Sequence, residues 1–218
     1  KTAEVKLLEE QIKSKDEKKK VIELYLNEFY DKNKKNLEKK EKIIKRHWRT
    51  INNKYEKIIL KLLELDKIIS MKATCFISIC PICPRNLKEK NFSVFYKQRK
   101  KESNLTISHE ILHFYYFLKW KLVFPKSDEK KFNGPHLIWH LSEILAVVLL
   151  NTKEPQDILK IKARGYKEYR NIKLNNMDVI EFFMRLYKRF SYKEISFSDF
   201  LRKAYLELRK YKTIIMKI

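Results

Sequence analysis

Apolar residues in the first third of the chain recur at alternating spacings of four and three, a pattern that predicts long α-helices. The clearest run would form a coiled-coil-like seam of more than three repeats. Its members are Ile44, Trp48, Ile51, Tyr55, Ile58, Leu62, Leu65 and Ile69. A weaker run precedes it, and the polar stretch at residues 31–36 predicts a break between two helices. We therefore expect a long, charged helical hairpin over residues 1–70.

The pattern changes after residue 70. Residues 73–79 and 91–96 are short runs rich in β-branched and aromatic residues, and the turn-prone stretch 80–86 separates them. Such runs predict the strands of a small β-sheet. They are too short for the helical periodicity seen on either side of them.

The rest of the chain returns to helical patterns. Residues 106–121 contain no Gly or Pro, and residues 135–151 are apolar on nearly all sides. Further helices are expected at residues 158–163, which end near Gly165, and later at residues 178–190 and 198–211. These elements predict an α+β fold that is predominantly α, with residues 71–218 as a second domain.

Composition limits the partners that the chain can have. The 218 residues carry a formal net charge of +23, which favours anionic partners, including nucleic acid. The Lys residues are spread along the whole chain, as a general compositional bias would place them, so nucleic acid is not the favoured partner. Only two Gly are present and no Gly-rich phosphate loop occurs, which argues against a nucleotide-dependent enzyme. The oligomeric state is left open.

The sequence contains no signal that would direct the protein to a particular compartment. No stretch is long and apolar enough to span a bilayer, and no secretory signal is present. We expect a cytoplasmic protein by default, with the reservation that a chain beginning at Lys1 instead of Met can lack its native N-terminus.

The helix expected at residues 106–121 carries the sequence His109-Glu110-Ile111-Leu112-His113, which reads H-E-x-x-H. On a helix, two His residues four apart lie on one face, so both imidazoles can reach one metal ion, with the Glu beside it. Four of the five His residues of the chain fall within residues 109–140. The pattern predicts a zinc site with His109 and His113 as ligands and Glu110 as the base.

A third ligand is expected from the helix at residues 135–151. His136, His140 and Glu143 follow spacings of four and three, and so share one stripe of an otherwise apolar helix. We favour Glu143 as the third ligand, because a charge in such a helix needs a partner. His140 is the main alternative ligand. Otherwise we expect His140 and His136 to be hydrogen-bonded core residues or donors to the reacting oxygen.

This arrangement resembles the gluzincin class of zinc metallopeptidases, in which H-E-x-x-H is followed in a second helix by a Glu. Here Glu143 follows His113 by 30 residues. The resemblance covers roughly residues 73–151 and is closest to the small single-domain members. It implies His109, His113 and Glu143 as Zn²⁺ ligands, Glu110 as general base and a peptide or protein as substrate. Val147 stands where the thermolysin family has an acidic residue, so the surroundings of the third ligand must differ.

The resemblance also implies that the strand before the zinc helix, residues 92–96, forms an exposed edge that pairs with substrate. The oxyanion of the reaction needs a hydrogen-bond donor. His140 and His136 are the first candidates, and Tyr166 and Tyr169 are weaker ones.

The pair Cys80 and Cys83, with Cys75, lacks the further ligands of a structural zinc site, so we expect reduced thiols. The alternative function for the whole chain is a basic helical protein that binds nucleic acid or serves as a scaffold, with structural histidines or a non-catalytic metal.

Overall fold

The computed structural model describes residues 15–66 and 71–217, and the chain divides into two compact units, Lys1–Ile43 and Ile44–Ile218. The long helix α2 (Lys15–Arg49) is continuous through residues 31–36, so the break predicted there is wrong. The stretch contains neither Gly nor Pro, and the Asn33 side chain donates to the Phe29 carbonyl oxygen at 2.9 Å instead of interrupting the helix. The parts of the predicted hairpin at residues 1–14 and 67–70, including Ile69, lie outside the described residues.

The chain turns at Thr50 and Ile51 and continues as α3 (Asn52–Leu62). This helix belongs to the second unit, because Tyr55, Ile59 and Leu63 are fully buried in its main core. The second unit therefore begins earlier than residue 71, where the sequence pattern placed the second domain.

A three-stranded sheet follows, in the order β1-β3-β2. Its strands are β1 (Thr74–Ser78), β2 (Arg85–Asn86) and β3 (Asn91–Phe95). Strand β3 is parallel to β1 and antiparallel to β2. The expectation that residues 92–96 form an exposed edge is therefore wrong. Phe92 and Val94 are buried, and β3 pairs on both of its sides, which leaves β2 at the edge.

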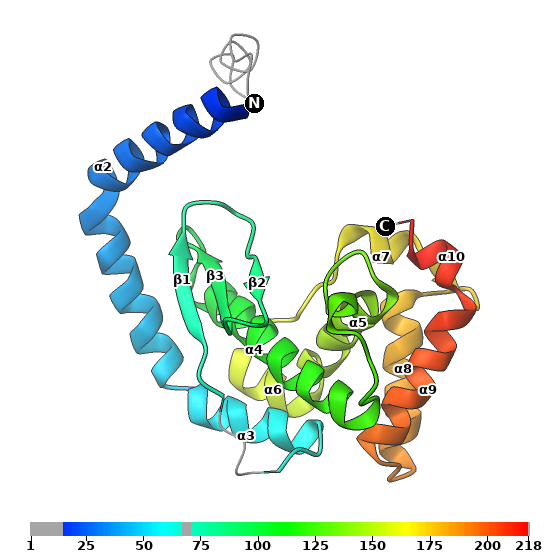
Figure 1. Cartoon of the computed structure of the whole chain (residues 1–218). Helices are drawn as coiled ribbons and strands as arrows, with labels where there is room; N and C mark the ends of the chain where they lie inside the picture. Colours follow the sequence, from blue (N-terminus) through cyan, green and yellow to red (C-terminus); the bar gives the residue numbers. More distant parts are fainter. Residues whose placement is uncertain (1–14, 67–70, 218) are drawn as a thin grey trace. The chain divides into compact units, whose positions relative to one another are not determined.

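Two helices lie at the centre of this unit (Figure 1). Helix α4 (Lys100–Val123) packs against the sheet, and α5 (Leu137–Leu150) lies against α4. Helix α4 begins earlier than predicted because the Glu102 carboxylate accepts a hydrogen bond from the Arg99 N–H at 2.8 Å, as a cap. Residues of α5 are almost all buried, as its uniformly apolar sequence predicted.

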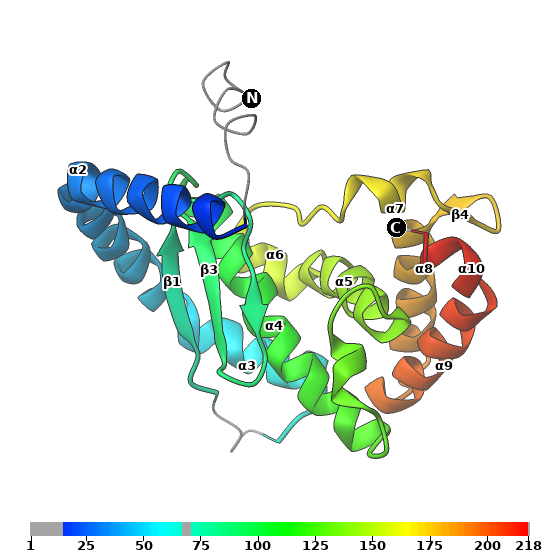
Figure 2. The same cartoon turned by 45° about the horizontal axis from the view of Figure 1, so that its top comes forward.

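The bounds of the remaining elements are η1 (Glu129–Phe132), α6 (Lys153–Leu159), α7 (Lys167–Asn171), β4 (Lys173–Leu174), β5 (Met177–Asp178), α8 (Val179–Tyr192), α9 (Phe197–Lys210) and α10 (Lys212–Ile215). Several of these elements, η1, α6, α8, α9 and α10, contact α5. Helices α8 and α9 pack on α5 (Figure 1). The helix expected at residues 158–163 ends at Leu159, and the chain then runs extended to α7 (Figure 2). The α+β, predominantly α fold is confirmed, and no helix among the described residues is long and apolar enough to cross a bilayer.

Candidate metal centre

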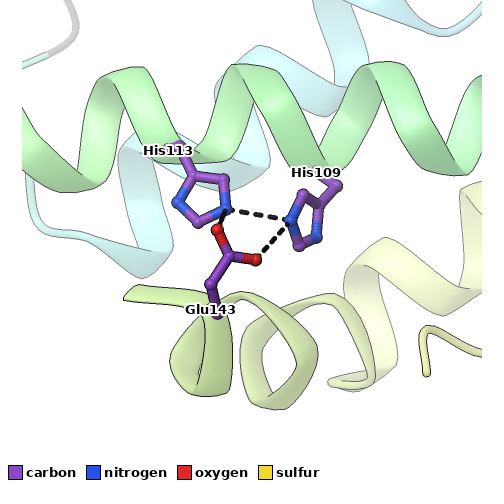
Figure 3. A group of neighbouring side chains, drawn as sticks. All are labelled: His109, His113 and Glu143. Carbon is purple, nitrogen blue, oxygen red and sulfur yellow. Dashed lines mark hydrogen bonds and ion pairs between the residues drawn. The ribbon is translucent and has the colours of Figure 1, made fainter. Parts of the chain in front are cut away.

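Two imidazoles of α4 and one carboxylate of α5 converge on a single point (Figure 3). The Nε2 atoms of His109 and His113 lie 2.9 Å apart. The Glu143 carboxylate places Oε2 at 3.1 Å from His109 Nε2 and Oε1 at 3.3 Å from His113 Nε2. The helical spacing of four sets the two rings side by side, and the packing of α5 against α4 brings Glu143 to them.

The residues present fit a zinc ion. One donor atom from each of the three lies within 4.8 Å of the others. Around a tetrahedral zinc ion with bonds of about 2.0–2.2 Å, neighbouring donor atoms lie about 3.3–3.6 Å apart. The two Nε2 atoms are 2.9 Å apart, and each faces a different oxygen of Glu143, His109 at 3.1 Å and His113 at 3.3 Å, so the two imidazoles and the carboxylate approach that spacing. Two imidazoles and one carboxylate are also a donor set typical of catalytic zinc, with a position left for water.

The site is closed on one side and open on the other. The side chains of His113 and Glu143 are 0% and 5% exposed, whereas that of His109 is 24% exposed. His109 therefore forms the face of the centre that solvent can reach. The Nδ1 atom of His113 is buried and has no hydrogen-bond partner among the described residues, so this ligand lacks the outer contact that usually orients a metal-bound imidazole.

Burial and neighbouring charges favour the ligand forms of two of the three groups. Burial, and then the Arg85 guanidinium, lowers the pKa of His113 to about 3, which keeps its imidazole neutral. Burial acts to raise the pKa of Glu143, but the two imidazoles outweigh it and hold that pKa well below the usual value. Burial also opposes protonation of His109, yet the carboxylates of Glu143 and Glu110 raise its pKa. Protons therefore compete with a metal mainly at His109.

Arg85, on the edge strand β2, joins the two carboxylates of the site. Its Nη1 atom donates to Glu110 Oε2 at 2.7 Å, and its Nη2 atom donates to Glu143 Oε1 at 3.4 Å. All three side chains are at least nine-tenths buried. Sequence reasoning missed this residue. A single Arg that follows a turn carries no local signal, and its partners lie 25 and 58 positions further along the chain.

The predicted base Glu110 lies at the wall of a cleft of about 430 Å³. His109 and Tyr166 line the same cleft, which also contacts the loop between β1 and β2. Arg85 holds only the Oε2 atom of Glu110, and Oε1 has no hydrogen-bond partner among the described residues. The carboxylate is thus fixed in place with one oxygen available to a molecule in the cleft.

The other predicted site residues are placed differently. His140 is buried, and its Nδ1 atom lies 3.0 Å from the Tyr169 hydroxyl, while its Nε2 atom has no partner among the described residues. It is not part of the group of possible metal ligands, which contains Glu143 instead. His136 is exposed at the N-cap of α5, outside the stripe that the spacing predicted. Of the two tyrosines, Tyr166 reaches the cleft, whereas Tyr169 is fully buried.

Burial, and then the carboxylates of Glu143 and Glu110, raises the pKa of Tyr166 to about 12. Its hydroxyl therefore keeps its proton at neutral pH and remains a donor. The three cysteines Cys75, Cys80 and Cys83 are free thiols, and Cys83 lines the cleft. Burial raises the pKa of Cys83, which keeps that thiol protonated as well.

No protein-family model, no curated protein and no solved structure matches this chain.

Proposed function

We propose that this protein is a zinc-dependent metallopeptidase of the gluzincin type, which hydrolyses a peptide bond with an activated water molecule. The observation that carries the proposal is the convergence of His109 Nε2, His113 Nε2 and the Glu143 carboxylate beside a cleft. The cytoplasmic location expected from the sequence is part of the same proposal.

The charge balance of the site supports a bound cation. Glu110 and Glu143 contribute two buried negative charges, and Arg85 contributes one positive charge. Buried charges are costly unless they are paired. When both imidazoles are neutral, as metal binding requires, the group keeps one excess negative charge that a divalent metal ion would compensate.

Each residue then has a chemical role. A bound Zn²⁺ would polarise the substrate carbonyl and lower the pKa of water toward about 7. Glu110 accepts a proton from the attacking water through its available oxygen and passes that proton to the leaving amine. The Tyr166 hydroxyl donates a hydrogen bond to the oxyanion that forms when water adds to the carbonyl carbon. The C–N bond then breaks, leaving a carboxylate and an amine.

The test separates metal binding from hydrolysis in two variants. Purified wild-type protein is expected to contain one equivalent of zinc by elemental analysis and to cleave unstructured protein substrates such as casein. Glu110→Gln should keep the zinc and lose hydrolysis by about 10²–10⁴-fold, because only the base is removed. Glu143→Ala should lose zinc and activity together. Glu38→Gln, at an exposed position of α2, is the matched control and should change neither.

A wild-type protein that binds no zinc at micromolar concentration would contradict the proposal. So would full activity in Glu110→Gln. Salt-sensitive binding of DNA or RNA by a metal-free protein would support the alternative function instead.

A further inference from the structure

One wall of the cleft is the extended stretch between α6 and α7, drawn in yellow in Figure 2. Helix α6 ends because Lys160 adopts a left-handed conformation with φ 53° and ψ 31°. Ala163, Arg164 and Tyr166 then line the cleft together with His109 and Glu110. The wall therefore consists of an extended stretch of chain outside any helix or strand, beside the candidate metal centre.

One edge of this stretch is already hydrogen-bonded. The Asn151 side chain accepts from the Ala163 N–H and donates to the Ala163 carbonyl oxygen, both at 3.0 Å, as a neighbouring strand would. The Gln156 side chain donates to the Ile161 carbonyl oxygen at 2.9 Å. Gly165 lies so close to the core that an added Cβ would meet Ile180 at 3.4 Å. These contacts fix the stretch in place.

The opposite edge is unpaired. In an extended chain the N–H and C=O groups of neighbouring residues point to opposite sides, so those of Lys162 and Arg164 face away from Asn151. Within residues 15–66 and 71–217, these groups have no hydrogen-bond partner. Both side chains are exposed. A fixed, unpaired strand edge is a template for the addition of another strand.

The charge beside this edge is positive. The Arg164 guanidinium forms no ion pair with any described residue, whereas Arg85, on the other side of the centre, is fully engaged by Glu110 and Glu143. Arg164 is thus a guanidinium at the cleft that is still available to a ligand. A carboxylate is the group that an unpaired guanidinium recognises best.

We propose that residues 162–165 bind the substrate as an added β-strand and that Arg164 selects an acidic side chain of that extended peptide. This inference rests on the proposed function, since it names the substrate of the same site. Main-chain hydrogen bonds with Lys162 and Arg164 would hold the peptide across the cleft beside Glu110. The charge of Arg164 would set where along the peptide the cut occurs.

The first experiment tests the charge. The probes are two pools of acetylated, amidated peptides of random Ala, Leu, Ser and Tyr sequence that carry either one Asp or one Lys. Zinc-loaded wild-type protein should cleave the Asp pool faster, with the Asp at a constant distance from the cut. Arg164→Glu should lower the ratio of kcat/KM for the Asp pool to kcat/KM for the Lys pool by about tenfold, since it replaces attraction of Asp by repulsion. Arg170→Glu makes the same charge change at an exposed site outside the cleft and should leave the ratio unchanged.

The second experiment tests the backbone. The best Asp peptide is N-methylated at one amide at a time, and its binding to the Glu110→Gln protein is measured by fluorescence anisotropy. Strand pairing predicts that methylation of every second amide lowers the binding affinity by about tenfold and that methylation of the amides between them has little effect. The reason is that only every second amide donates a hydrogen bond to the stretch at residues 162–165.

The outcomes separate the two proposals. Cleavage without a charge preference, or a preference that Arg164→Glu leaves unchanged, overturns the inference and leaves the peptidase intact. A loss of affinity at every methylated amide, or at none of them, also overturns it. Binding of Asp peptides that depends on Arg164, without any cleavage, supports the inference and contradicts the peptidase. If the protein neither binds nor cleaves the probes, both are overturned.

Discussion

Arg85 balances the charge of the candidate centre. It is the only described residue that hydrogen-bonds to both Glu110 and Glu143, and it does so from the edge strand β2. Its two hydrogen bonds hold both carboxylates in place, although Val147 offers no acidic side chain to the centre.

Arg85→Met should lower the free energy of unfolding by about 3–5 kcal/mol in EDTA, because it leaves two buried carboxylates without their partner. The loss should be smaller in excess zinc, since the ion supplies positive charge to the same carboxylates. Urea unfolding under both conditions measures the difference. Arg99→Met, which breaks an exposed pair with Glu102, is the control and should have little effect. An equal loss with and without zinc would contradict the assigned role.

Tyr166 is the tyrosine that can reach a substrate, because Tyr169 is buried against His140. Tyr166→Phe should lower kcat by about 10–10³-fold, with little change in KM or zinc content, since the hydrogen bond forms only to the developing oxyanion. Steady-state kinetics on the zinc-loaded protein measures kcat and KM separately. Tyr192→Phe, at a side chain that is 91% exposed, should behave as wild type. An unchanged kcat in Tyr166→Phe would contradict this role.

Among the secondary-structure elements, local sequence patterns predicted most of the helices. They failed where a side-chain contact or a pairing with a distant strand determines the backbone conformation. The continuous periodicity of residues 106–121 and 135–151 gave both central helices, and H-E-x-x-H with Glu143 selected the residues that converge. The helix predicted at residues 158–163 fails because Asn151 and Gln156 capture its backbone. The sheet order, and with it the place of Arg85, depends on pairings that no local pattern contains.

The position of α4 depends on α3. The Tyr55 hydroxyl, fully buried, donates to the Ser108 carbonyl oxygen at 2.6 Å, one residue before His109. Tyr55→Phe should lower the free energy of unfolding by about 1 kcal/mol, the net value of one such bond. Urea unfolding measures it. Tyr25→Phe, at a side chain that is 62% exposed on α2, should have no effect. No change in Tyr55→Phe would show that α3 is held by apolar packing alone.

For the whole molecule, the candidate centre links two helices that also form the middle of the core. His109 and Glu143 are 34 positions apart, so an ion that binds both acts only on the folded chain. Zinc at 100 times its dissociation constant should raise the free energy of unfolding by about 2.7 kcal/mol. Calorimetry or urea unfolding with zinc and with EDTA measures the gain. His113→Ala should abolish it, and a gain that persists in that variant would place the zinc elsewhere.

The placement of the ligands on two separate helices has a consequence for the living cell. A chain without its ion would open more often between α4 and α5, and proteases act on opened chains. Its steady-state abundance should then follow the supply of zinc, so that starvation for the metal removes the protein as well as its activity.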